Sequence, residues 1–191
     1  MSDCTVFELR QYTLKPGRTD ELVDVFDRQL VHTQEDVGIT VVGQFRDLER
    51  PDRFVWLRGF ADMAARRTAL KAFYGGPAWR EHGPVANDTM VAWDDVLLLA
   101  PIRPVADEGR PEQDAPHLPQ HLTISVHPAG TPTADDDVVS LATLHEDNTF
   151  PALPVRTDLD VVVRVRRDEE ALTFPTLQVV LADPTAGSRL R

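Results

Sequence analysis

The sequence predicts an α+β protein: a ferredoxin-like β-α-β-β-α-β module plus a helix-poor second four-stranded module, together forming an α/β barrel. Three observations support this. Strand-like and helix-like periodicities follow one another in the ferredoxin-like order over residues 1–100. Residues 120–191 repeat the order of strands and turns of the first part, but the segments between these strands are too short for full helices. Residues 101–119, between these two parts, contain five prolines, which is typical of an extended linker.

The first part begins with a strand followed by a helix. Residues 5–14 alternate between two faces, as in a β-strand, and the Lys-Pro-Gly sequence at residues 15–17 predicts a turn. Residues 19–37 then change to helical spacing, with apolar side chains on one side and acidic side chains on the other. This pattern predicts an amphipathic helix ended by Gly38.

The rest of the first part completes the β-α-β-β-α-β order. Asp62 has the side chain of a helix N-cap, and it precedes a predicted helix over residues 63–74. A short further helix is expected around Trp79. The predicted strands lie at residues 39–46, 53–60 and 88–99.

The second part is predicted to be a sheet without helices to cover it. Its expected strands lie at residues 121–127, 138–145, 160–166 and 176–182. The outer face of this sheet, which we expect to carry Leu122, Ile124 and Val126, would be exposed unless the linker or another chain covers it. Large exposed apolar patches mark interaction sites, so the sequence predicts a homodimer formed through this face.

Composition excludes several classes of protein. There are 31 acidic and 20 basic residues, for a net charge of −11, which argues against partners of nucleic acid or anionic membrane. No apolar run approaches the ~20 residues that span a bilayer, and the N-terminus lacks a signal-peptide pattern, so a cytoplasmic location is expected. The single cysteine rules out an internal disulfide and a cysteine-cluster metal site.

Several segments resemble the NIPSNAP family. The run Phe7–Gly17 (FELRQYTLKPG) is similar to the family's opening signature, and Phe54–Phe60, Trp79 and Leu97–Pro101 are similar to its later parts. Glu146–Arg156 resembles the second module of two-module members. The resemblance implies a dimeric α/β-barrel fold, which cofactorless monooxygenases, muconolactone isomerase-like enzymes and haem-dependent barrel enzymes share.

The candidate site is predicted inside this barrel. If Phe7 and Leu9 face the helices, then Glu8, Arg10 and Tyr12 point inward. The other residues expected to face the interior are Trp56, Arg58 and Phe60 from the third strand, and His121, Thr123, Ser125, His127 and Arg164 from the second part. Because buried charges are costly unless they are paired, Glu8 is expected to meet Arg10 or Arg58.

These residues suggest a cofactor-independent enzyme of the oxygenase, isomerase or cyclase type, acting on a small carbonyl-bearing or aromatic metabolite. Glu8 or His121 could move a proton, and Arg58 could hold an anionic or carbonyl group. The remaining interior residues would bind the substrate; neither a metal nor a cofactor is expected.

Three alternatives stay open for the same residues. The Glu–Arg pairs could be a structural network that sets strand register. The protein could be a non-catalytic carrier of a metabolite or of haem, with His32 or His121 as the haem ligand. It could also be a structural or assembly subunit, in which case side chains would fill the barrel interior.

Overall fold

The computed structural model describes residues 3–106, 109, 121–167 and 174–190. Most of the predicted linker and part of residues 168–175 lie outside this range. The elements, in chain order, are β1 (Val6–Leu14), α1 (Thr19–Val25), the π-helical η1 (Phe26–Leu30), α2 (Val31–Glu35), β2 (Thr40–Asp47), β3 (Arg53–Phe60), α3 (Met63–Gly75), α4 (Pro77–Thr89), β4 (Met90–Pro101), β5 (Leu122–Pro128), β6 (Val139–Thr143), β7 (Val161–Arg166) and β8 (Gln178–Pro184).

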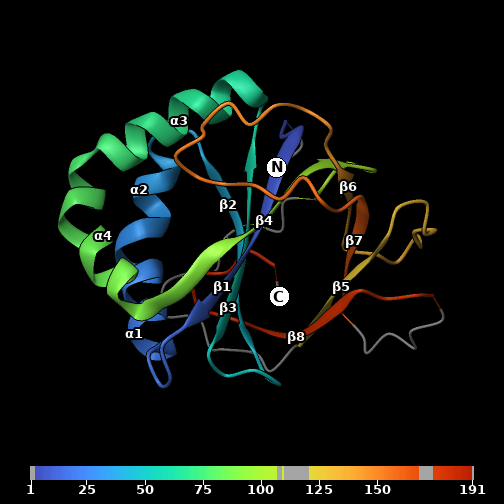
Figure 1. Cartoon of the computed structure of the whole chain (residues 1–191), viewed down its shortest axis with the longest axis horizontal. Coiled ribbons are helices and arrows are strands. Elements are labelled where there is room, and N and C mark those ends of the chain that lie inside the picture. Colours follow the sequence, from blue (N-terminus) through green and yellow to red (C-terminus); the bar gives the residue numbers. More distant parts are fainter. Residues whose placement is uncertain (1–2, 107–108, 110–120, 168–173, 191) are drawn as a thin grey trace.

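The protein has a mixed α/β fold built on a closed, eight-stranded antiparallel barrel. The strand order around the barrel is β1-β3-β2-β8-β5-β7-β6-β4. Strands from the two parts of the chain meet at two seams, where β2 pairs with β8 and β4 pairs with β6. Figure 1 shows the helices gathered over β1–β3, with β5–β8 forming the other side of the barrel. One chain therefore closes the barrel without a second copy.

The helices agree with the sequence pattern, with one extension. The predicted helix over residues 19–37 is present as α1, η1 and α2 in continuous succession. Asp62 caps α3 as predicted, since its carboxylate accepts a hydrogen bond of 2.7 Å from the Ala65 amide. The helix around Trp79 is longer than expected, because α4 continues to Thr89. Within α4, the Trp79 indole lies so close to Gly83 that a Cβ there would approach it to 2.7 Å.

The barrel interior is packed with apolar side chains contributed by all eight strands. From β1 these are Phe7 and Leu9, and from β3 they are Val55 and Leu57, all at most 2% exposed. The predicted orientation of these strands was therefore wrong: Phe7 and Leu9 face the interior, while Glu8, Arg10 and Tyr12 face the helices. A small closed barrel has no room for water around charged groups, so its interior takes the apolar face of each strand.

The prediction of an exposed apolar face on the second sheet was also wrong. Leu122, Ile124 and Val126 of β5 are at most 3% exposed and belong to the barrel core, so they are not an uncovered outer face. The argument for a homodimer through these residues fails, although homodimerisation itself stays a prediction. No helix in the described part of the chain is long and apolar enough to cross a membrane.

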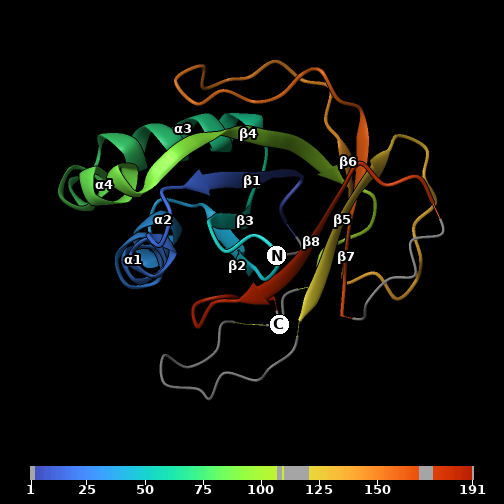
Figure 2. The same cartoon turned by 60° about the horizontal axis from the view of Figure 1, so that its bottom comes forward.

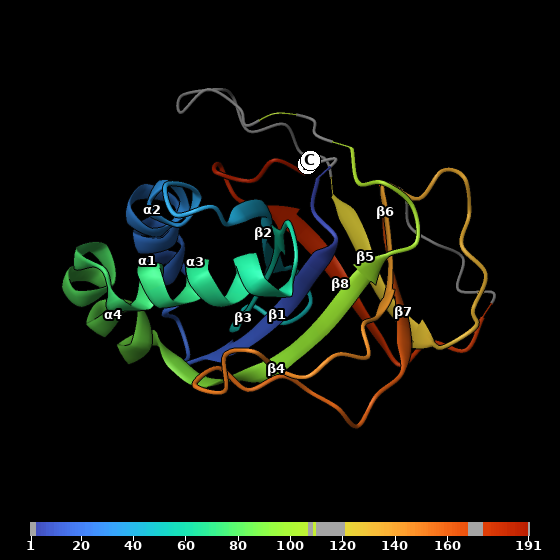
Figure 3. The same ribbon diagram turned by 90° about the horizontal axis from the view of Figure 1, so that it is seen from above.

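The segment between β6 and β7 returns toward the helices along β4 (Figures 2 and 3). Leu144 and Arg156 donate backbone hydrogen bonds to carbonyls of β4, at 2.9 and 2.8 Å. Between them, Thr149 donates to the Met63 carbonyl at the start of α3, at 3.1 Å. Part of the second half of the chain thus lies beside the helical layer of the first half.

Candidate functional site

A buried ion cluster lies between the sheet and the helices. Glu8 on β1 is directly opposite Arg58 on β3. One Glu8 carboxylate oxygen, Oε2, accepts hydrogen bonds of 2.8 Å from both Arg58 Nε and Arg10 Nη1. All three side chains are at most 1% exposed. The predicted meeting of Glu8 with Arg10 or Arg58 is confirmed, and both arginines take part.

A third arginine, from α3, completes the cluster. Arg66 Nε donates to the other Glu8 oxygen, Oε1, at 2.6 Å. Arg66 Nη1 donates to the side-chain oxygen of Asn148 at 3.0 Å, which ties the β6–β7 segment to the cluster. Glu8 therefore connects the sheet, a helix and, through Arg66, a loop from the second half of the chain.

The arginines determine the charge state of Glu8. Burial by itself would raise the pKa of its carboxyl group, but the charges of Arg58, Arg10 and Arg66 outweigh burial and hold this pKa well below its usual range. Glu8 is consequently ionised in the folded protein near neutral pH. Such a carboxylate is a weak base, so its clearest role is to position the three guanidinium groups.

Arg10 joins this cluster to an aromatic cavity. Its Nε donates to the Tyr12 hydroxyl at 2.9 Å, and its guanidinium lies 5.6 Å from the ring centres of both Tyr12 and Trp56. The Arg58 guanidinium also lies over aromatic rings, 5.0 Å from the ring centre of Trp56 and 5.4 Å from that of Phe60. Cations at these distances are attracted to aromatic faces.

The cavity lies between β1, β3 and the helices and is small, about 20 Å³, which is room for about one water molecule. Its inner wall is fully buried. Its outer wall is formed by Tyr74, Trp79 and Met90, which are partly exposed. Its lining residues are Tyr12, Leu22, Phe26, Leu30, Gln34, Trp56, Phe73, Tyr74, Trp79, Ala86 and Met90. Admission of anything larger than water therefore requires the outer wall to move.

The lining of the cavity includes a few polar groups, among them the Trp56 indole N–H and the Gln34 amide. The Trp56 Nε1 group is buried and has no hydrogen-bond partner among the described residues. Gln34 donates to the Leu30 carbonyl and accepts from Arg58. The π-helical turn Phe26–Leu30 presents both of its end residues to the cavity, and π-helical turns occur frequently at functional sites.

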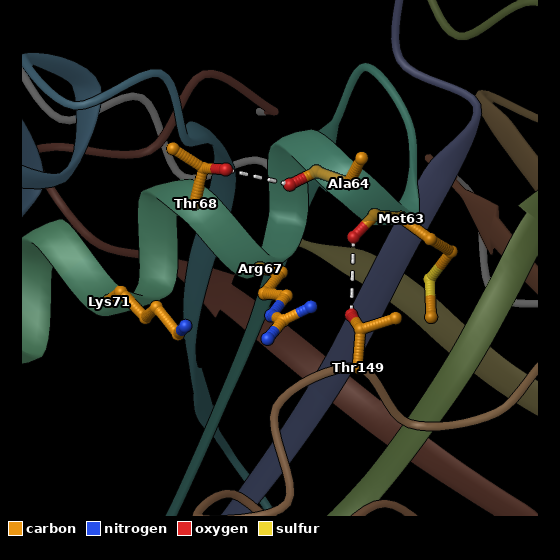
Figure 4. Close-up of a pocket in the computed structure, with 6 residues that line it drawn as sticks. All are labelled: Met63, Ala64, Arg67, Thr68, Lys71 and Thr149. Atoms are coloured by element: carbon orange, nitrogen blue, oxygen red, sulfur yellow. Dashed lines mark hydrogen bonds between the residues drawn. The ribbon is translucent and has the colours of Figure 1, made fainter.

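A second, open groove lies on the outer side of α3. It has a volume of about 550 Å³ and lies beside the β6–β7 segment, from which Thr149 contributes to its wall (Figure 4). The other lining residues are Met63, Ala64, Arg67, Thr68 and Lys71. The groove and the aromatic cavity share no lining residue, so they are separate features.

The site residues predicted from the second part of the chain do not lie at the aromatic cavity. Thr123, Ser125 and Arg164 alternate with the core residues of their strands, and so face outward on the far side of the barrel from Glu8. Arg164 is paired there with buried Asp137, at 2.9 Å. Ser125 Oγ lies 2.9 Å from Nε2 of His127. The structure therefore does not bring these three residues to the cavity.

The histidines considered for proton transfer or haem binding are also away from the cavity. The His121 side chain is 48% exposed and lies 3.9 Å from Asp183, and the His32 side chain is 68% exposed. Since neither lines the cavity, the residues present do not fit a haem group there. Within the described ranges, no group of three or more His, Cys, Asp or Glu residues is placed to hold a metal ion.

Two important residues were not identified from the sequence. Arg66 occupies a position on the buried face of α3 together with Met63, Leu70 and Phe73. Gln34 similarly continues the apolar stripe that runs through Phe26 and Leu30. A polar residue within an apolar helical stripe was the available signal, because such a residue must find a buried partner.

Comparisons with known proteins agree with this fold. The sequence profile of the NIPSNAP family matches residues 7–102. No curated protein matches the chain significantly. A solved structure from Lactobacillus acidophilus, provisionally assigned as a monooxygenase, is 12% identical, covers 96% of this chain and 97% of its own, and has a TM-score of 0.54.

Several solved structures match about half of the chain. A NIPSNAP family protein of unknown function from Agrobacterium tumefaciens is 19% identical, over 54% of this chain and 93% of its own, with a TM-score of 0.48. An uncharacterised NIPSNAP-like domain protein from Burkholderia xenovorans is 23% identical, over 61% and 93%, with a TM-score of 0.47. The family profile spans half of the sequence, and on this ground the chain belongs to the NIPSNAP family.

Proposed function

We propose that this protein binds a small molecule in the aromatic cavity between the sheet and the helices. The observation that carries the proposal is Trp56, whose buried indole N–H has no acceptor in the part of the chain that the structure describes. Buried donors are normally hydrogen-bonded, and an exception in a native structure calls for an explanation. A bound molecule that supplies an acceptor atom is such an explanation, and ligand sites typically combine aromatic walls with a few polar groups.

We further propose that the protein is a cofactor-independent enzyme of the oxygenase, isomerase or cyclase type. Its substrate would be a small carbonyl-bearing or aromatic metabolite. The site supplies an enclosed, water-poor space and positive charge from Arg10 and Arg58, which would polarise such a substrate. The monooxygenase assignment of a structure with the same fold is compatible with this class.

The roles within this proposal differ from those expected. Arg10, Tyr12 and Trp56 would contact the substrate or lie directly behind it, and Arg58 would support Trp56. Glu8 would position the arginines rather than carry a proton. His121, Thr123, Ser125 and Arg164 have no part in it, because they lie on the opposite side of the barrel. The finer architecture, a ferredoxin-like module joined to a second module that lost its helices, is likewise our interpretation.

Native mass spectrometry of gently purified protein tests the binding proposal. We expect a retained small molecule, and we expect Trp56→Phe to reduce its occupancy. Trp93→Phe is the matched control, because Trp93 is 50% exposed on β4 and does not line the cavity. Oxygen uptake or product formation with the retained molecule, in the absence of added cofactor, would then separate an enzyme from a carrier.

One observation favours a structural subunit as a second candidate. The apolar core fills the barrel interior, and the aromatic cavity holds only about 20 Å³ in its closed form. If the purified protein retains no molecule and a panel of small aromatic and carbonyl compounds leaves its melting temperature unchanged, this second candidate replaces the first.

A further inference from the structure

The buried ion cluster contains more positive than negative charge. Arg10, Arg58 and Arg66 are each at most 1% exposed. Among the described residues, Glu8 is the only carboxylate within 4 Å of any of their side-chain nitrogens. Three guanidinium groups and one carboxylate leave a surplus of two positive charges. A buried cation without a counterion costs several kcal/mol, by an order-of-magnitude estimate.

The other acceptors of these arginines do not reduce this surplus, because they are neutral. Arg10 donates to the Tyr12 hydroxyl, and Arg58 donates to the side-chain oxygen of Gln34, at 3.2 Å. Tyr12 and Gln34 both line the aromatic cavity. The excess positive charge therefore lies directly behind the inner wall of the cavity, where the low dielectric of the protein screens it poorly.

Two hydrogen-bond donors in the same wall have no acceptor within the described ranges. Trp56 Nε1 is buried and has no partner there. The Tyr12 hydroxyl accepts from Arg10, and the structure assigns no acceptor to its own proton among the described residues. Burial raises the pKa of Tyr12 more than Arg10 lowers it, so the hydroxyl stays protonated and able to donate. Donors on residues that line a cavity, backed by positive charge, are the components of an oxyanion-binding site.

We infer that the cavity binds its ligand as an oxyanion, through the phenolate or enolate oxygen of a small planar molecule. This inference rests on the proposed function, because it concerns the same cavity. The Tyr12 and Trp56 donors would receive the anionic oxygen, and the arginine surplus would stabilise its charge. The surrounding aromatic rings fit a planar body. The site would favour loss of the ligand's acidic proton to solvent, because the anion binds more strongly than the neutral acid.

A coloured phenol tests this inference directly. 4-Nitrophenol absorbs differently as phenol and as phenolate, so a pH titration of the bound compound gives its pKa in the site. We expect the phenolate to bind at least ~10-fold more tightly than the neutral phenol, which lowers the pKa of the bound compound by about one unit. Tyr12→Phe removes one donor with little change in volume, and Trp56→Phe removes the other together with one ring of the indole; both should reduce this preference. Trp93→Phe should leave it unchanged.

The outcomes distinguish this inference from the proposed function. If 4-nitrophenol binds with its pKa unchanged or raised, the oxyanion inference fails while the binding cavity stands. If Tyr12→Phe and Trp56→Phe both leave binding unaltered, the compound binds elsewhere and the inference fails. If 4-nitrophenol does not bind and native mass spectra show no retained molecule, both the inference and the proposed function fail. Thermal unfolding of each variant verifies that it is folded.

Discussion

Glu8 and Arg58 face each other directly across β1 and β3, and the Glu8 carboxylate accepts the Arg58 Nε hydrogen bond at 2.8 Å. Arg10 and Arg66 donate to the same carboxylate. A single negative charge thus neutralises part of the charge of three arginines in a layer from which water is excluded. The stability of this layer should depend on Glu8 more than on any one arginine.

Replacing Glu8 by Gln should therefore be strongly destabilising. The substitution keeps the size of the side chain but leaves three buried guanidinium groups without an anion. Breaking a buried ion pair costs about 3–5 kcal/mol of unfolding free energy. Urea denaturation measures the change, and exposed Glu49→Gln is the control, expected within about 0.5 kcal/mol of the parent. A loss below about 1 kcal/mol for Glu8→Gln would contradict the surplus of positive charge.

Replacing Arg66 by Met should cost less than replacing Glu8. Glu8 keeps Arg10 and Arg58 as partners, and the positive surplus falls by one charge. The lost hydrogen bonds, to Glu8 and Asn148, suggest a change of about 1–3 kcal/mol. Arg67→Met on the same helix is the matched control, since Arg67 is exposed. If Arg66→Met were as damaging as Glu8→Gln, the arginines would not be in excess.

Protonation of Glu8 should contribute to the loss of stability in acid. The pKa of Glu8 is lower in the folded chain than in the unfolded chain. Ionised Glu8 therefore contributes its full share to the free energy of unfolding above the unfolded-state pKa, and this share is lost as the pH falls from there toward the folded-state pKa. Between about pH 5 and pH 2, the parent protein should lose stability more steeply than Glu8→Gln. Denaturation midpoints at several pH values test this. Parallel curves for the two proteins would show that Glu8 has the same pKa in the folded and in the unfolded chain, contrary to this prediction.

The burial of Ile124 in the barrel core can be tested with a pair of isoleucines. Ile124 lies in the barrel core at 1% exposure, whereas Ile102 is 44% exposed just after β4. Ile124→Ala should cost about 2–5 kcal/mol through lost burial and cavity formation. Ile102→Ala should cost much less. Equal effects would mean that Ile124 does not face a packed interior.

The contact between the β6–β7 segment and the ion cluster makes a further prediction. Asn148→Ala removes the acceptor of Arg66 Nη1 and two bonds within the segment: one of 3.0 Å that Asn148 accepts from the Phe150 amide, and one of 2.8 Å that it donates to the Leu153 carbonyl. This segment should then open more readily, because three of its hydrogen bonds are lost. Limited proteolysis should detect faster cleavage between β6 and β7 than in Asp147→Ala, whose side chain is exposed. Equal cleavage rates would show that Arg66 does not hold the segment.

Much of the architecture follows from local sequence patterns. The order of strands and helices, the Asp62 cap and the NIPSNAP resemblance depend on periodicity, turn residues and short motifs. The pairing of Glu8 with Arg10 or Arg58 also follows from the sequence, because a buried carboxylate must be partnered. These features are set by residues close in sequence or by a requirement that holds for any buried charge.

Only the tertiary structure decided which way the strands face. The alternation in β1 separates Phe7 and Leu9 from Glu8 and Arg10, but a period of two does not say which set points into the barrel. Both faces of β1 are buried, one by the barrel interior and one by the helices, so burial does not distinguish them. The choice depends on the closure of the barrel by β2–β8 and β4–β6 pairing, which excludes water from the interior and leaves the charged side chains on the helical side, where Arg66 and the aromatic cavity meet them.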